Sequence, residues 1–71
     1  PKQIKEKAGE KEKIFKQNPF NPILVTHRLH GKYKDYWSFS IDESYRIMFQ
    51  FLDAEKTKVA LINIGTHEIY K

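Results

Sequence analysis

The feature that most constrains the fold is residues 37–51, where apolar and polar side chains alternate in two consecutive runs. The runs are Trp37–Ile41 and Tyr45–Phe51, and the polar turn 42–44 separates them. A period of two places successive side chains on opposite faces of a β-strand. The stretch therefore predicts a β-hairpin with one apolar and one polar face.

The pairing of this hairpin follows from the position of its turn. If Ile41 lies opposite Tyr45, the pleat places the alternate side chains together on the face turned away from the core. One arginine then stands among hydroxyl groups, which is suited either to an ordinary surface or to a phosphate site. The residues expected on that face are Ser38 near Met48, and Ser40 opposite Arg46.

Two further elements complete the predicted fold. Lys2–Gln17 is rich in good helix formers and has a narrow apolar stripe, so it predicts a helix that Asn18–Pro22 ends. Lys58–Ile64 predicts a third strand that Gly65-Thr66 breaks, and its apolar residues on both sides favour a central position or coverage on both faces. We expect one α+β domain, residues 1–71, with the helix packed on a three-stranded antiparallel sheet.

The segment between the helix and the hairpin contains both apolar residues that can anchor it to the core and cationic residues. Phe20 and residues 23–25 are expected to fold the chain back on the core, with Leu29 as a further anchor and Gly31 as a turn. Residues 27–36 interleave aromatic rings with cations, which suits single-stranded nucleic acid because rings stack on bases while cations meet phosphates. An ordinary turn that enters a strand is the alternative.

Net charge and composition limit the classes of molecule that this protein is expected to bind. The net charge is +4, and no acidic residue lies between Glu12 and Asp35. A local basic surface favours a polyanion, nucleic acid first and an anionic membrane second, although it also serves solubility. The chain has no cysteine, which excludes disulfides and a thiol nucleophile and fits a reducing cytoplasm. No apolar run approaches the roughly 20 residues of a membrane helix.

The side chains available for chemistry suit metal-free RNA cleavage. Glycine loops for phosphate, acidic pairs and a serine-triad motif are missing from the sequence, and we do not expect a metal site from its three histidines. RNA is cut when its own 2′-hydroxyl attacks the adjacent phosphorus, which requires proton transfer and stabilisation of phosphorane charge. Histidine, arginine, lysine and tyrosine supply these functions. The candidates are His27, His30, Lys32, Lys34, Arg46, His67 and Tyr70.

Structural roles are open for several of these candidates. The structural alternative for Arg46 is an ion pair with Asp42 or Glu43 in the hairpin turn. The alternative for His67 is to cap the end of the last strand, and the alternative for Tyr70 is to serve as a hydrophobic anchor.

Four short motifs lie in order along the chain: HxLxGxxKxY from His27, SFSI from Ser38, YRIxF from Tyr45 and IGTH from Ile64, with Tyr70 close behind. In this order they resemble the RelE/StbE branch of the RelE/ParE toxin superfamily. The resemblance covers nearly the whole chain, and YRI followed by GTH is its most specific part.

The resemblance implies a small twisted antiparallel sheet with helices on one face. Family members begin with a strand and a first helix, so we expect this chain to correspond to a member from its second helix onward. Many members are toxins of type II toxin–antitoxin systems that cut messenger RNA in the ribosomal A site without metal or cofactor. A cognate antitoxin protein blocks them. The implied location is the cytoplasm, with messenger RNA on the ribosome as substrate and no membrane partner.

Roles carried over by position are as follows. Arg46 matches the strand arginine on the scissile phosphate, His67 the proton-transfer histidine and Tyr70 the aromatic near the C-terminus. His27 matches the histidine of the HxLxG loop and is our candidate general base. The residues expected to contact the RNA are Arg28, His30, Lys32 and Lys34.

Two positions depart from the histidine-rich subgroup of the family. Ser40 stands where that subgroup has a second histidine, and Ser44 where it has an aspartate, so the sequence leaves the general base open. Two other functions remain possible for this fold: a ParE-type toxin that binds gyrase without enzymatic activity, and an inactive relative that only binds an antitoxin.

Overall fold

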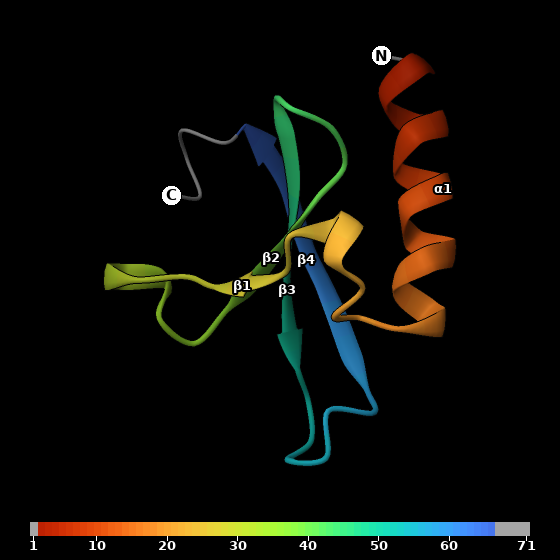
Figure 1. Cartoon of the computed structure of the whole chain (residues 1–71). Coiled ribbons are helices and arrows are strands. Elements are labelled where there is room, and N and C mark those ends of the chain that lie inside the picture. The colour runs from red at the N-terminus through yellow and green to blue at the C-terminus, as the bar shows by residue number, and fades with distance from the viewer. Residues whose placement is uncertain (1, 67–71) are drawn as a thin grey trace.

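The computed structural model describes residues 2–66, which form one helix and one antiparallel sheet (Figure 1). The strand order is β1-β2-β3-β4, so each strand pairs with its neighbours in sequence. The predicted α+β class is confirmed, but the sheet has four strands and not three. The elements are α1 (Lys2–Gln17), η1 (Pro22–Leu24), β1 (His27–Arg28), η2 (Gly31–Tyr33), β2 (Trp37–Ser40), β3 (Tyr45–Phe51) and β4 (Val59–Thr66).

Helix α1 has the predicted bounds, and local chemistry explains where it ends. The N–H of Asn18 still donates to the carbonyl of Ile14 at 2.9 Å. Pro19 cannot continue the helix, because it lacks an N–H and disfavours helical geometry in the residue before it. The side-chain oxygen of Asn18 then accepts from the N–H of Phe20 at 3.0 Å, which fixes the exit of the chain.

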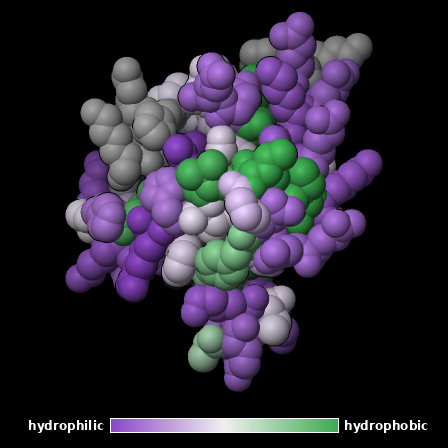
Figure 2. All heavy atoms as spheres, in the orientation of Figure 1, coloured by the Kyte–Doolittle hydropathy of each residue, from purple (hydrophilic) through white to green (hydrophobic). Residues whose placement is uncertain are grey.

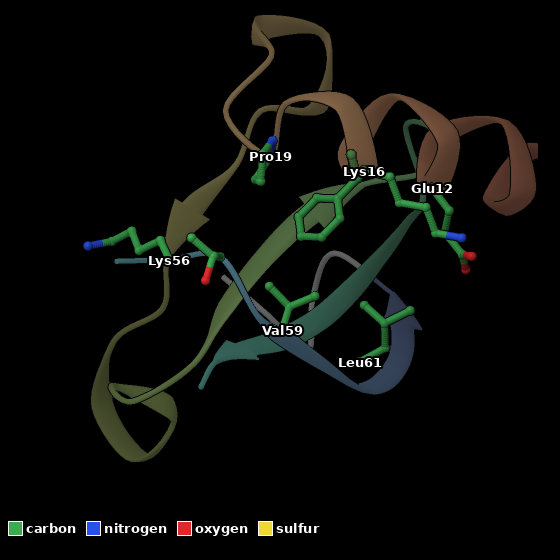
Figure 3. Close-up of a pocket in the computed structure, with 8 residues that line it drawn as sticks. Glu12, Lys16, Pro19, Lys56, Val59 and Leu61 are labelled. Carbon is green, nitrogen blue, oxygen red and sulfur yellow. The ribbon is translucent and has the colours of Figure 1, made fainter. Parts of the chain in front are cut away.

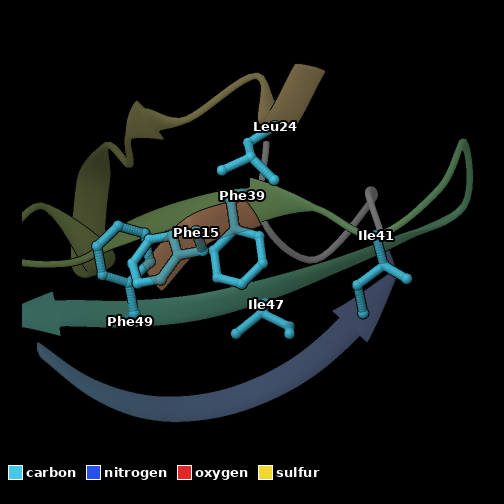
Figure 4. Packing of buried hydrophobic residues seen from close by; sticks show 6 residues of the cluster. All are labelled: Phe15, Leu24, Phe39, Ile41, Ile47 and Phe49. Carbon is cyan, nitrogen blue, oxygen red and sulfur yellow. The ribbon is translucent and has the colours of Figure 1, made fainter. Parts of the chain in front are cut away.

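The main core lies between α1 and the sheet (Figure 4). The ring of Phe15 stacks on Phe39, with centroids 4.5 Å apart, and meets Phe49 edge-on at 4.8 Å. Such pairs add specific geometry to the burial of apolar surface. The remaining buried members of this cluster are Leu24, Ile41 and Ile47.

The hairpin has the predicted register. Ser40 pairs with Arg46, and Ser38 with Met48. The N–H of Ile41 donates to the carbonyl of Tyr45 at 2.9 Å, which closes the ladder beside the turn. The predicted placement of these side chains on the sheet face opposite α1 is therefore confirmed.

The face opposite α1 is nevertheless not an open polar surface. Leu29 and Met48 are buried on it, and Tyr33 and Tyr36 pack against them. Residues 29–36 thus form a second layer over part of this face. In Figure 1 the segment with η2 projects from the sheet on the side away from α1.

Strand β4 differs from its prediction in both position and length. It lies at the edge of the sheet, continues through Gly65 and Thr66, and exposes 49% of Leu61 and 45% of Ile62. Within residues 2–66 this strand is therefore neither central nor fully covered on both faces. Its pairing with β3 shifts between Met48 and Phe49, where a β-bulge interrupts the regular register.

The expected anchors after α1 are only partly confirmed. Leu24 and Leu29 are fully buried, whereas Phe20, Ile23 and Val25 are about half exposed. Phe20 still contacts the core rim through an edge-on ring contact with Trp37 at 5.7 Å. Hydrophilic side chains cover most of the molecular face shown in Figure 2, with an apolar band near its middle.

Helix α1 is the one α-helix in residues 2–66, and it lacks the length and apolar character needed to cross a bilayer.

Candidate functional site

The candidate site lies on the sheet face opposite α1. One row across the strands joins His27 of β1 to Ser38 of β2, and the next joins Ser40, Arg46 and Gly65. Paired residues share a face, so His27 and Arg46 project to the same side. Two strand spacings and two residues separate them, which corresponds to about 12 Å between their Cα atoms. A phosphodiester group fits between side chains at that separation.

The imidazole of His27 is held in one tautomer. Its Nδ1 lies 3.0 Å from the carbonyl oxygen of Val25. A carbonyl only accepts, so Nδ1 carries the hydrogen of the neutral ring and Nε2 keeps a lone pair. The side chain is half-buried at the edge of the sheet. In this form His27 is able to take a proton through Nε2.

The carbonyl that orients His27 belongs to a strained residue. Val25 has φ 50° and ψ 43°, the left-handed conformation, at the end of η1. A β-branched residue is rare there, because its Cβ crowds the following carbonyl oxygen. The N–H of Val25 donates to the carbonyl of Pro22 at 3.2 Å, which helps to hold this conformation. The backbone strain is thus located where the candidate base receives its hydrogen bond.

Arg46 is half-buried in the middle of the site face. Burial lowers the pKa of its guanidinium, but an arginine side chain stays protonated in proteins. Of the two acids considered as its structural partners, Asp42 forms an ion pair with Lys7 at 3.5 Å. Asp42 also accepts from the N–H groups of the turn, and these bonds hold the pKa of its carboxyl below the ordinary value.

Ser38 is the feature of this face that sequence reasoning missed. Its side chain is fully buried, and its Oγ has no hydrogen-bond partner in the part of the chain that the structure describes. It pairs with His27 on one side and Met48 on the other. The alternation alone shows Ser38 as a surface hydroxyl. The one available signal is its position opposite Met48, an apolar residue on the supposedly polar face.

The four residues predicted to contact RNA are all exposed: Arg28, His30, Lys32 and Lys34. The Nε of Arg28 donates to the carbonyl of Lys34 at 3.0 Å and closes the loop between them. The ammonium of Lys32 lies 5.2 Å from the centroid of the Tyr33 ring. Tyr33 and Tyr36 pack against Leu29 and Met48, so the loop exposes its cations more than its rings. This geometry suits contacts with phosphates.

Two of the predicted catalytic residues, His67 and Tyr70, lie outside the described residues. Thr66 is the last described residue, and it pairs with Tyr45 directly beside Arg46.

An apolar hollow of about 210 Å³ lies elsewhere, between α1 and β4 (Figure 3). Phe15, Val59 and Leu61 line it, with charged side chains at its rim. It is on the opposite face of the sheet from Arg46 and belongs to a different surface. Within residues 2–66, no group of three or more histidine, aspartate and glutamate side chains is arranged to hold a metal ion.

The fold and this face define a small α+β domain with a cationic, histidine-containing sheet surface. No family model, curated protein or solved structure matches the chain.

Proposed function

We propose that this protein is the toxin of a type II toxin–antitoxin system and cleaves messenger RNA on the ribosome by 2′-hydroxyl attack. The observation that carries the proposal is the shared sheet face of His27 and Arg46, with His27 in a tautomer that leaves Nε2 as acceptor. The ordered motifs that resemble RelE/StbE toxins support the same activity. The cytoplasm is its proposed location, and a cognate antitoxin its proposed protein partner.

The proposed reaction needs only side-chain chemistry and the substrate. Nε2 of His27 takes the proton from the 2′-hydroxyl as its oxygen attacks phosphorus. The guanidinium of Arg46 donates two parallel hydrogen bonds to the phosphorane oxygens, whose negative charge grows in the transition state. His67 protonates the departing 5′-oxygen. The products are a 2′,3′-cyclic phosphate and a free 5′-hydroxyl, so atoms and charges balance.

The remaining residues are assigned to RNA binding. Tyr70 is proposed to stack on a base or orient the substrate. The cationic loop 28–34 forms much of the second layer on this side of the sheet, and its exposed ammonium and guanidinium groups are proposed to contact the RNA backbone. Such contacts release counterions, and binding should therefore weaken strongly as salt is added.

The test is a ribosome translation assay in which cleavage sites are mapped on a defined messenger RNA. The wild-type chain should arrest translation and cut the message. Arg46→Ala and His67→Ala should each reduce cleavage at least 100-fold, while Lys13→Ala on the exposed side of α1 should not. Full cleavage by both site variants would show that the assignment is wrong. Inhibition of DNA supercoiling with intact message would instead favour a gyrase-binding toxin.

A further inference from the structure

Val25 has a backbone conformation that its own side chain does not explain. Its φ of 50° and ψ of 43° lie in the left-handed region, which a β-branched residue rarely adopts. Within residues 2–66 the side chain is 56% exposed, so little burial of apolar surface offsets the cost. A strained backbone of this kind persists only where the surrounding structure imposes it.

Contacts on both sides of Val25 impose this conformation. On the N-terminal side, Leu24 is fully buried in the core (Figure 4), and its N–H donates to the carbonyl of Asn21 at 2.9 Å. On the C-terminal side, the hydroxyl of Thr26 donates to the carbonyl of Pro19 and closes the segment into a loop. The chain is thus fixed before and after Val25, and the dihedral angles of this residue absorb the constraint.

The conformation of Val25 decides where its carbonyl points. An extended residue has a ψ of about 135°, so relaxation to an extended backbone would turn the carbonyl by about 90° around the Cα–C bond. In the left-handed conformation the carbonyl oxygen lies 3.0 Å from Nδ1 of His27. The hydrogen bond at one ring nitrogen decides which tautomer of a neutral imidazole is held. The strained backbone therefore selects the tautomer with hydrogen on Nδ1.

We propose that Val25 is a positioning residue, whose left-handed backbone aims its carbonyl at His27 and keeps Nε2 of that ring as a proton acceptor. The role in RNA cleavage rests on the proposed function, because the proton concerned is that of the 2′-hydroxyl. The effect on the tautomer does not, because it follows from the hydrogen bond between the two residues. Thr26 contributes indirectly, since its hydroxyl closes the loop that constrains Val25.

The strain at Val25 also makes the positioning easy to release. Because the left-handed conformation is unfavourable for valine, loss of one neighbouring hydrogen bond should allow the backbone to relax. Thr26→Val removes the hydroxyl that bonds Pro19 while it keeps the shape of the side chain. Asparagine tolerates the left-handed conformation, so the double variant Val25→Asn, Thr26→Val should hold the carbonyl in place without the hydroxyl.

NMR of the imidazole nitrogens in the full chain, made with isotope-labelled histidine, tests the proposal at a pH where the rings are neutral. The signals of His27 are identified by their absence from His27→Gln. In the wild type His27 should carry its hydrogen on Nδ1. Thr26→Val should shift the tautomer ratio toward hydrogen on Nε2 by about fivefold, the effect of one ordinary hydrogen bond, and the double variant should restore the ratio.

Thr57→Val is the matched control, because it removes the hydroxyl of another threonine, which bonds the carboxylate of Asp53 in the turn before β4. This variant should leave the tautomer ratio of His27 unchanged. Equal shifts by Thr26→Val and Thr57→Val would overturn the proposal, since they would report a general loss of stability. Hydrogen on Nε2 of His27 in the wild type would also overturn it, even if Thr26→Val fails to fold.

Single-turnover cleavage of a message on purified ribosomes gives the functional readout. The rate should fall by about fivefold in Thr26→Val and return in the double variant, whereas Thr57→Val should cleave like the wild type. A wild-type chain that does not cleave RNA would refute the proposed function. The NMR result would then still decide whether Val25 positions the ring of His27.

Discussion

Replacing His27 by glutamine removes the proposed proton acceptor while keeping a side-chain N–H that can reach the carbonyl of Val25. The wild-type Nδ1 donates to that carbonyl over 3.0 Å. A glutamine amide can donate in the same way, but it cannot take a proton from a 2′-hydroxyl at neutral pH. The variant therefore separates the chemistry of the imidazole from its contribution to folding.

The expected loss of cleavage rate in His27→Gln is much larger than the expected loss of folding stability. A positioned general base contributes about 10² to 10⁴ in rate, which corresponds to roughly 3 to 5 kcal/mol of transition-state stabilisation. The folding contribution is much smaller, because His27 is half-buried and gives one side-chain hydrogen bond of about 1 kcal/mol. His27→Gln should thus lose at least 100-fold in cleavage while its free energy of unfolding falls by no more than about 1 kcal/mol.

Cleavage is measured as single-turnover cutting of a defined message on purified ribosomes, and stability by urea unfolding. Lys13→Gln is the control, because Lys13 is an exposed residue of α1 outside the candidate site and its substitution introduces the same glutamine side chain. If His27→Gln cleaves within threefold of wild type, or if both variants lose activity equally, the assignment of His27 as base is refuted.

Three further predictions concern stability and binding. Val25→Asn should raise the free energy of unfolding by about 1 kcal/mol in urea denaturation, because asparagine tolerates the left-handed conformation that strains valine. Hydrogen bonds from Thr57 and Lys58 lower the pKa of Asp53, so this carboxylate stabilises the fold above its unfolded pKa and loses that effect as the pH falls through its folded pKa. Asp53→Asn should therefore reduce the loss of thermal stability between pH 7 and pH 3. Glu55→Gln, in the same exposed turn, should not. An equal pH dependence in both variants would contradict the stabilising role of the Asp53 carboxylate. Replacing Lys32 and Lys34 together by glutamine should reduce the salt slope of single-stranded RNA binding by about 1.4, and an unchanged slope would exclude them as phosphate contacts.

Local patterns in the sequence determined the elements that need only neighbouring residues. The bounds of α1 follow from helix-forming residues and the Asn18-Pro19 stop, and the pairing of Ser40 with Arg46 follows from alternation about a short turn. These features are set by backbone geometry with a period of 3.6 or 2 residues, so a single stretch of chain contains the information. The candidate site residues were chosen from side-chain chemistry and motif order, which the sequence also contains, and their roles stay predictions.

Only the tertiary structure decided which surfaces are covered. The sequence does not show that β1 joins the sheet, that residues 29–36 pack over Met48, that Ser38 is buried, or that the apolar strand β4 is the last strand of the four-stranded sheet. The hydrogen bond that fixes the tautomer of His27 depends on the left-handed backbone conformation of Val25. No pattern of side chains in the sequence predicts this conformation. Burial and edge position depend on contacts between segments distant in sequence, and periodicity reports only that a side chain needs a partner, not which segment supplies it.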